Sequence, residues 1–145
     1  MSNATLVFDI ETVPDIDGGR RILGLESEDD DTVWEAMRAK RRADKGTEFM
    51  PGHLQKVVAI SCVMRAADAL TCWSIGDETS DEAELIQKFF HGIDRYHPVL
   101  VSWNGGGFDL PVLHYRGLIN GVRAQAYWDN GHFERDTKWN NYTKR

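Results

Sequence analysis

Apolar and polar residues alternate near the N-terminus and predict a strand whose two faces differ in chemistry. Side chains two apart on a strand point to the same face. One face of the segment 5–11 is apolar, and Asp9 and Glu11 project together from the other. The apolar set consists of Leu6, Phe8 and Ile10. Val7 shares the face of the two acids, which favours a strand that is partly covered on both sides.

Farther along the chain, strand-like and helix-like periods succeed one another. The predicted elements are strands at 55–65 and 70–75, a helix at 80–96, a strand at 99–103 and a helix at 109–119. The strands at 55–65 and 70–75 form a hairpin, and the apolar run at 99–103 is typical of a buried parallel strand. Trp103, at its end, is expected in the core. Hairpin strands followed by helix, strand and helix predict an α/β fold with a mixed sheet.

The segment between the first two strands gives a weaker pattern. Residues 13–31 have a loop-like composition, with Pro14, Gly18-Gly19 and an acidic run. Thr32-Val33-Trp34-Glu35 has the form of a capping box, which predicts a helix to about Lys45. A basic cluster follows toward the end of this helix, made of Arg38, Lys40, Arg41 and Arg42. We interpret this cluster as a solvated face rather than as a phosphate contact.

Two acidic segments fall where predicted strands end. Asp9 and Glu11 close the first strand, and Asp109 follows the fourth after the turn 104–108. Carboxylate oxygens are the ligands that Mg²⁺ prefers, together with waters and substrate phosphates. Two such ions about 4 Å apart can drive displacement at phosphorus. The pattern therefore favours a metal-dependent phosphodiesterase, and an edge strand with two solvated acids is the alternative.

These segments resemble known motifs. F-D-I-E-T at 8–12 and N-G-G-G-F-D at 104–109 resemble motifs I and II of the DEDD, or DnaQ-like, 3′-5′ exonucleases, which have a ribonuclease H-like fold. Together with V-V-A-I-S at 57–61, they are similar to the predicted 3′-5′ exonucleases related to the proofreading domain of family B DNA polymerases. The resemblance covers nearly the whole chain and implies a single exonuclease domain over residues 1–145.

The resemblance implies roles for three carboxylates and two ions, Mg²⁺ or Mn²⁺. Asp9 would bridge both metals, Glu11 would share the metal that activates water, and Asp109 would hold the second metal near the leaving oxygen. These residues are the expected catalytic and metal-binding set.

The resemblance also implies a substrate site. The backbone around Thr12 would meet the terminal 3′ hydroxyl, and Asn104 and Phe108 would line the last nucleotide. The expected partner is the 3′ end of a nucleic acid, single-stranded DNA rather than RNA, although discrimination depends on 2′-hydroxyl contacts that a sequence does not specify.

Members of this superfamily carry a third motif, a Tyr or His shortly before an Asp on a late helix. His132 and Asp136 are four apart, but they follow the turn-like Asp129-Asn130-Gly131, so a surface loop is the better interpretation. We therefore expect a domain that is incomplete at its C-terminus, binds metal weakly and is nearly inactive alone. It would also expose apolar surface that favours self-association. The alternative is a catalytically inactive exonuclease-fold module for nucleic-acid binding or scaffolding.

Composition sets further bounds. A net charge of −6 over 145 residues argues against strong duplex binding, for which a basic surface is expected. No apolar run approaches the roughly 20 residues that span a membrane, and no signal peptide is visible. Cys62 and Cys72 are expected as reduced core thiols in a cytoplasmic protein. The five histidines show no zinc spacing. The three glycines at 105–107 lack the ending of a P-loop, and an actin-like phosphate loop would require glycine at Glu11.

Overall fold

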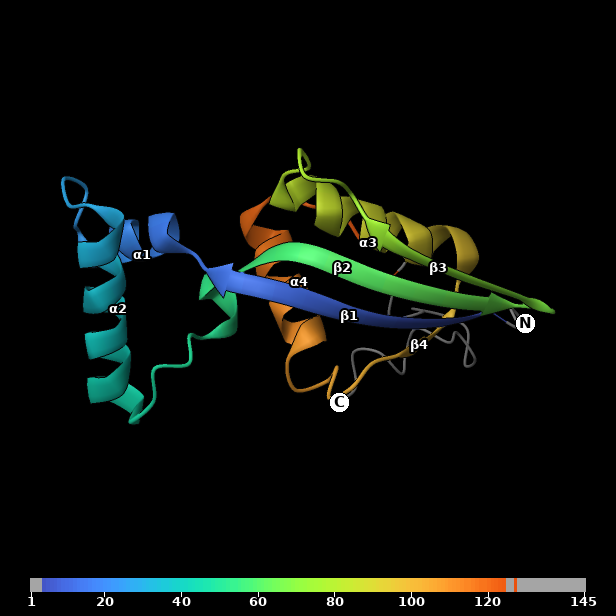
Figure 1. The fold of residues 1–145 in the computed structure, drawn as a ribbon, viewed down its shortest axis with the longest axis horizontal. Helices are drawn as coiled ribbons and strands as arrows, with labels where there is room; N and C mark the ends of the chain where they lie inside the picture. The colour runs from blue at the N-terminus through green and yellow to red at the C-terminus, as the bar shows by residue number, and fades with distance from the viewer. Residues whose placement is uncertain (1–3, 125–126, 128–145) are drawn as a thin grey trace, which may run out of the picture.

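The structure of the chain is a computed structural model that describes residues 4–124 and residue 127. Its elements are β1 (Thr5–Pro14), α1 (Ile16–Leu23), α2 (Asp30–Lys45), the 3-10 helix η1 (Gly52–Leu54), β2 (Gln55–Ala66), β3 (Ala69–Ile75), α3 (Glu82–Tyr96), β4 (Val99–Val101) and α4 (Asp109–Ile119). The sheet has the order β3-β2-β1-β4, with β1 antiparallel to β2 and parallel to β4. Helix α3 runs alongside the strands, α4 crosses behind them, and α1 and α2 lie beyond the end to which β1 points (Figure 1). The predicted α/β class, with a mixed sheet and flanking helices, is confirmed.

The alternation along β1 divides the sheet into two different faces. Leu6, Phe8 and Ile10 are 3–5% exposed and belong to a core shared with β2, α3 and α4. Fully burying a side chain of this size stabilises the fold by about 1.5–3 kcal/mol. On the other face, Val7 and its neighbour Val101 are each 44% exposed. Within the described residues, therefore, the helices cover one face and leave the other open.

Two burial predictions are wrong because the described helices cover only one face of the sheet. Of the run 99–103, only Val99–Val101 forms the parallel strand, at the edge of the described sheet, where Val99 is 48% exposed; Trp103, beyond its end, is 93% exposed. Cys72 is also exposed, whereas Cys62 is buried. Cys62 pairs with Trp73 and Cys72 with Val63, so the two thiols leave the sheet on opposite faces.

The segment predicted as loop contains a helix. Asp15 accepts a hydrogen bond from the Gly18 amide at 3.0 Å and caps α1. The glycines favoured a loop prediction, but Gly19 lies against Met37 of α2, where a side chain has no room. The cap of α2 is Asp29 rather than Thr32, because the Thr32 amide donates to the Asp29 carboxylate at 2.8 Å.

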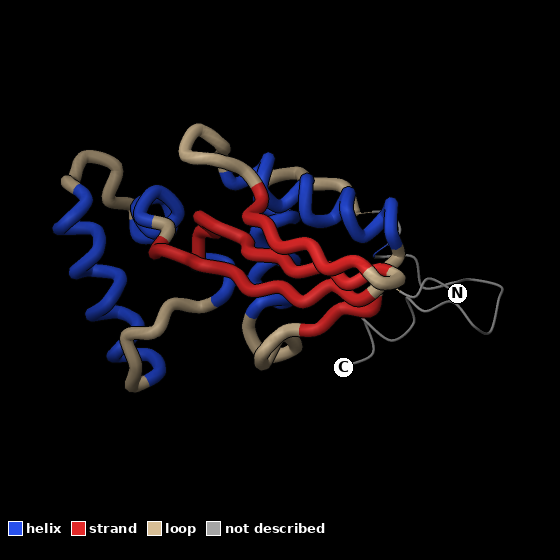
Figure 2. Tube along the Cα trace, turned by 45° about the vertical axis from the view of Figure 1, so that its right-hand side comes forward, coloured by secondary structure: helices blue, strands red, loops and turns tan. Residues whose placement is uncertain are grey.

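A second, smaller core holds α1 and α2 together. Its fully buried members are Val33, Met37 and Met50, and Leu54 of η1 packs against them. Figure 2 shows this helical pair at one end of the strands, joined to β2 by an extended loop. That loop, residues 46–51, carries side chains toward the start of α4.

Candidate active site

Two of the three predicted carboxylates meet across β1 and α4. Asp109 begins α4 directly after the turn that follows β4, and it is only 2% exposed. Its carboxylate accepts a hydrogen bond from the Ser102 hydroxyl at 3.1 Å and one from the Ile10 backbone amide. Asp9, one residue before Ile10, is exposed on the open face of β1. The parallel pairing of β1 with β4 thus brings these two acids together although 100 residues separate them.

The electrostatics of Asp109 are unfavourable for a bare carboxylate. Burial raises its pKa above the ordinary value of 3.8, and the nearby charge of Asp9 raises it further. Hydrogen bonds from Ser102 and from the backbone amides of Asp109 and Ile10 lower the pKa but do not cancel the increase. A divalent cation would reverse this balance, because it attracts both carboxylates and replaces the lost hydration.

These two carboxylates fit one Mg²⁺ or Mn²⁺ ion, since Mg²⁺ is commonly held by one or two carboxylates plus water and substrate oxygens. Glu11 is exposed and shares the face of Asp9 on β1. Among the described residues, however, no group of three His, Cys, Asp or Glu is arranged to hold a metal ion. The structure therefore joins Asp9 to Asp109 and does not bring Glu11 into one cluster with them. His132 and Asp136 lie outside the described residues.

The turn before Asp109 has a specific shape that its glycines permit. Asn104 has a left-handed backbone with φ of 58°, and its carbonyl accepts hydrogen bonds from Gly107 and Phe108 at 2.8 and 3.1 Å. A Cβ at Gly105 would lie 2.6 Å from the Ser102 hydroxyl oxygen. A Cβ at Gly107 would likewise collide with the Asn104 carboxamide. The close approach of Ser102 therefore requires glycine at position 105, whereas at Gly107 the exposed Asn104 carboxamide would have to move.

The predicted contact at Thr12 falls on an irregular part of β1. The β1–β2 register shifts between Glu11 and Thr12, next to the carboxylates. Such irregularities are frequent beside functional sites because they redirect side chains and interrupt the ladder. The Thr12 hydroxyl donates to Gln55 at 2.9 Å, so it is the backbone of Thr12 that remains the predicted substrate contact.

An aromatic side chain that sequence reasoning missed lies beside Phe108. Phe49 is 61% exposed, and its ring centroid is 5.7 Å from that of Phe108 with the planes tilted by 51°. Phe108 itself is half-buried and packs on the main core. The pair places an exposed aromatic surface next to Asp109. Phe49 and Phe108 are far apart in the sequence, so no local pattern could indicate their contact.

The loop that carries Phe49 is held by the basic cluster of α2. Arg41 donates from Nε to the Phe49 carbonyl at 2.8 Å. Arg38 and Arg42 both pair with Glu48, one residue before Phe49. The prediction of a merely solvated basic face is thus incomplete, because three of its arginines position this loop.

A buried ion network, also missed, anchors the elements around the site. Arg116 of α4 is 3% exposed and binds Glu82 through two hydrogen bonds of 2.8 and 2.5 Å. The same guanidinium donates to Asp15 at 2.6 Å and to the His53 carbonyl at 2.7 Å. Asn120 completes the network by donating to Glu82 at 2.9 Å. The N-cap of α1, the helix η1 and the start of α3 are therefore all joined to α4.

The fold and the acidic pair define an α/β protein with a candidate metal site at the edge of its sheet. Comparison with protein families agrees: a family described as "predicted 3′-5′ exonuclease related to the exonuclease domain of PolB" matches residues 47–145. The chain belongs to this family. The match includes Asp109 and Phe49, and Asp9 and Glu11 lie before it.

Among solved structures, the chain is similar to the family B DNA polymerase from the hyperthermophilic archaeon Pyrobaculum calidifontis. The two are 20% identical with a TM-score of 0.48, over 83% of this chain and 12% of the polymerase chain. This chain therefore spans about an eighth of the polymerase. No curated protein matches the chain. None of the described helices is long and apolar enough to cross a membrane.

Proposed function

We propose that this chain is a metal-dependent 3′-5′ exonuclease domain, extending over residues 1–145, that hydrolyses phosphodiester bonds at nucleic-acid 3′ ends. The observation that carries the proposal is the meeting of buried Asp109 with exposed Asp9 at the junction of β1, β4 and α4. Membership of the exonuclease-related family supports it. Location in the cytoplasm is a further part of the proposal.

The residues of the proposed site have different roles. Asp9 and Asp109 would hold one Mg²⁺ or Mn²⁺, and Glu11 is the proposed ligand for a second ion. When bound, such ions neutralise charge at phosphorus and lower the pKa of a coordinated water. Ser102 fixes the orientation of Asp109 through its hydroxyl. The Thr12 backbone would meet the 3′ hydroxyl of the strand.

The proposed substrate is single-stranded DNA, bound by stacking at its end. Asn104 is exposed on the turn, and Phe108 and Phe49 present aromatic surface beside it. Stacking of a base on an aromatic ring is worth about 1–3 kcal/mol and is tolerant of sequence. Because the loop that carries Phe49 is held by three arginines, this surface is preorganised rather than formed on binding.

The test measures metal binding and nucleotide release separately. Mn²⁺ titrated into the chain should bind, and Asp9→Ala or Asp109→Ala should abolish this binding. Under single-turnover conditions, with the chain in excess over a single-stranded oligonucleotide, Mn²⁺ should produce a slow release of nucleotides from the 3′ end. Glu26→Gln is the matched control, since it removes an exposed carboxylate outside the site. Failure of Mn²⁺ to bind in an Asp9-dependent manner would refute the proposed metal site.

The alternative, a catalytically inactive binding module, is favoured by one observation. No third acid joins Asp9 and Asp109 within the part of the chain that the structure describes. If Mn²⁺ binds and the oligonucleotide binds, but no nucleotide is released even in single turnover, the module is the correct function.

Self-association is a separate part of the proposal. Val7, Val99 and Val101 are 44–48% exposed on neighbouring strands of the open sheet face. We propose that a second copy covers this surface. Sedimentation should show a dimer that Val101→Lys dissociates, whereas a concentration-independent monomer would rule this contact out.

A further inference from the structure

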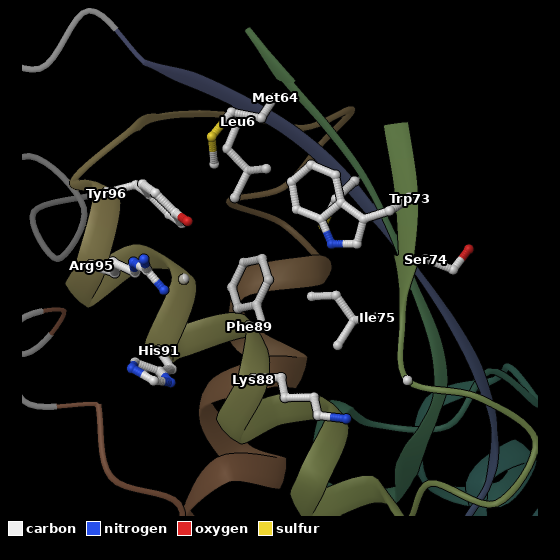
Figure 3. A pocket seen from close by; sticks show the side chains of 13 residues that line it. Leu6, Met64, Trp73, Ser74, Ile75, Lys88, Phe89, His91, Arg95 and Tyr96 are labelled. Atoms are coloured by element: carbon white, nitrogen blue, oxygen red, sulfur yellow. The ribbon is translucent and has the colours of Figure 1, made fainter. Parts of the chain in front are cut away.

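A pocket of about 400 Å³ lies on the side of the sheet opposite to Asp9 and Glu11, between α3 and the β2–β3 hairpin (Figure 3). We call it the α3–β3 pocket. Its floor includes Leu6 and Cys62, which point to the helix-covered face, whereas Asp9 points to the open face. The sheet therefore separates this pocket from Asp9 and Glu11, and none of the residues that line it belongs to the candidate active site.

The walls of the pocket are apolar and partly aromatic. Trp73 of β3 pairs with Cys62 and is 37% exposed, so its indole stands over the pocket rather than inside the core. Figure 3 shows the indole on one side of the pocket and Phe89 and Ile75 below it. Ser74 points away, as its place on the strand requires. A flat ring could lie against Trp73 without disturbing the core.

A glycine in the middle of α3 keeps the pocket open. Gly92 is an interior residue of a 15-residue helix, where glycine is less favourable than alanine. A Cβ built on Gly92 would meet no atom within 4 Å, so close packing does not require the glycine. Gly92 lines the pocket, and any larger side chain at this position would extend into its space.

The rim of the pocket on α3 is basic. Lys88, His91 and Arg95 are spaced three and four apart, which places them on one face of the helix. Lys88 is also paired with Glu84 at 2.5 Å, and the Arg95 guanidinium lies over the Tyr96 ring at 5.2 Å from its centroid. None of the 13 described residues that line the pocket is acidic. The rim therefore favours an anion.

We propose that the α3–β3 pocket binds a small aromatic monophosphate of nucleotide size, with its ring against Trp73 and its phosphate at Arg95. The volume lies within the range of about 300–1,000 Å³ that is usual for small-molecule sites. A purely apolar ligand would make no use of the basic rim, and a bare anion would make no use of the aromatic wall. Arginine suits phosphate because its planar guanidinium can donate two hydrogen bonds at once.

The test is isothermal titration of the whole chain with deoxyadenosine 5′-monophosphate in excess EDTA, which keeps metal away from the acids. One molecule should bind, and deoxyadenosine and inorganic phosphate should each bind at least about tenfold more weakly, because each lacks one half of the recognition. Arg95→Gln and Trp73→Leu should weaken binding by at least about tenfold. Gly92→Leu should abolish it by filling the pocket.

Two matched controls locate the site. Gly92→Ala should retain binding, since a methyl group occupies little of the space, and Asp9→Asn should bind like the unchanged chain. Circular dichroism and thermal melting show that each variant is folded. Because Arg95 is exposed, Arg95→Gln keeps the test decisive if Gly92→Leu does not fold. Absence of binding at millimolar nucleotide, or binding that Asp9→Asn removes and Gly92→Leu does not, would overturn the proposal.

Discussion

Replacing Arg116 by alanine would break the ion network that joins α4 to the end of β1 and the start of α3. The Arg116 guanidinium donates hydrogen bonds to Glu82, to Asp15 and to the His53 carbonyl. Asp15 and Glu82 are each 7% exposed. The variant would therefore leave two buried carboxylates without their cation and one carbonyl without its donor.

The expected loss of stability follows from these contacts. Removing one partner of a buried ion pair costs about 3–5 kcal/mol, because the other charge stays buried. The His53 carbonyl is only partly buried, so losing its donor adds less than the roughly 1–3 kcal/mol of a fully buried unsatisfied group. Neighbouring contributions do not add fully, so we expect Arg116→Ala to lower the free energy of unfolding by about 4–6 kcal/mol. A domain of this kind has about 5–15 kcal/mol in total, so the variant should be near the limit of folding.

Urea denaturation followed by circular dichroism measures this loss, and the Tm should fall by about 10–20 °C, at roughly 2–4 °C per kcal/mol. Arg116→Lys should be intermediate, since it keeps the charge but loses the planar fork of donors. Lys40→Ala is the control, because Lys40 pairs with Asp44 where both side chains are more than half exposed. A loss below about 1 kcal/mol for Arg116→Ala, the size expected of a surface pair, would refute the reasoning.

The same network predicts a dependence of stability on pH. Burial raises the pKa of Asp15, but hydrogen bonds from the Gly18 amide and from Arg116 outweigh it, and the pKa is lowered from 3.8. A lowered pKa in the folded state means that the stabilisation is present above pH 3.8 and is lost as pH falls through the lowered value. Acid unfolding should therefore become less steep below pH 3.8 in Arg116→Ala, where this contribution is reduced.

Three further variants test the site. Burial and the charge of Asp9 raise the pKa of Asp109, so its ionisation costs stability as pH rises above 3.8. Asp109→Asn should therefore raise the Tm at pH 7 in EDTA, with no gain below pH 3.8. An unchanged Tm at pH 7 would contradict this. Gly105→Ala should displace Ser102 and weaken Mn²⁺ binding. Gly106→Ala should bind Mn²⁺ normally, because its Cβ meets nothing within 4 Å. Equal effects of the two variants would show that contact with Ser102 is not the cause. Phe49→Ala should weaken binding of a single-stranded oligonucleotide by about 5- to 100-fold in a fluorescence titration, and Phe49→Tyr should preserve it, while equal affinity for both would exclude stacking.

The main elements of the fold could be predicted because each has a local cause. The β1 alternation, the helical stripe of α3 and the hairpin of β2 and β3 are all confirmed, since each depends on residues within one segment. The acidic pair was also predictable, because β1 and β4 are parallel neighbours and such strands present their ends to the same edge. What local periodicity could not supply was burial at β4, which depends on what covers the edge of the sheet.

The parts that could not be predicted depend on partners distant in the sequence. Arg116 is 34 residues from Glu82 and 101 from Asp15. In the sequence each of these charges resembles an ordinary solvated one, and only the fold brings them together. Phe49 is similar, because its position beside Phe108 depends on arginines of α2 that hold its loop. The glycines of α1 misled in the opposite direction, since they serve close contacts rather than a flexible loop.

The distribution of charge over the sheet shows where function and stability conflict. Asp9 and Glu11 occupy the open face of β1, where an ionised carboxylate costs little. The network of Arg116 buries charges too, but it supplies them with a cation and hydrogen bonds. Asp109 differs from both groups, because it is 2% exposed and the charge that acts on it is that of another acid, Asp9. Its hydrogen bonds come from Ser102 and backbone amides, which orient the carboxylate without neutralising it. A fold selected only for stability would avoid burying a carboxylate beside another acid, whereas a cation-binding site requires such a pair. Mn²⁺ should therefore raise the Tm of the unchanged chain and leave that of Asp109→Asn where it was; an equal rise in both would place the ion elsewhere.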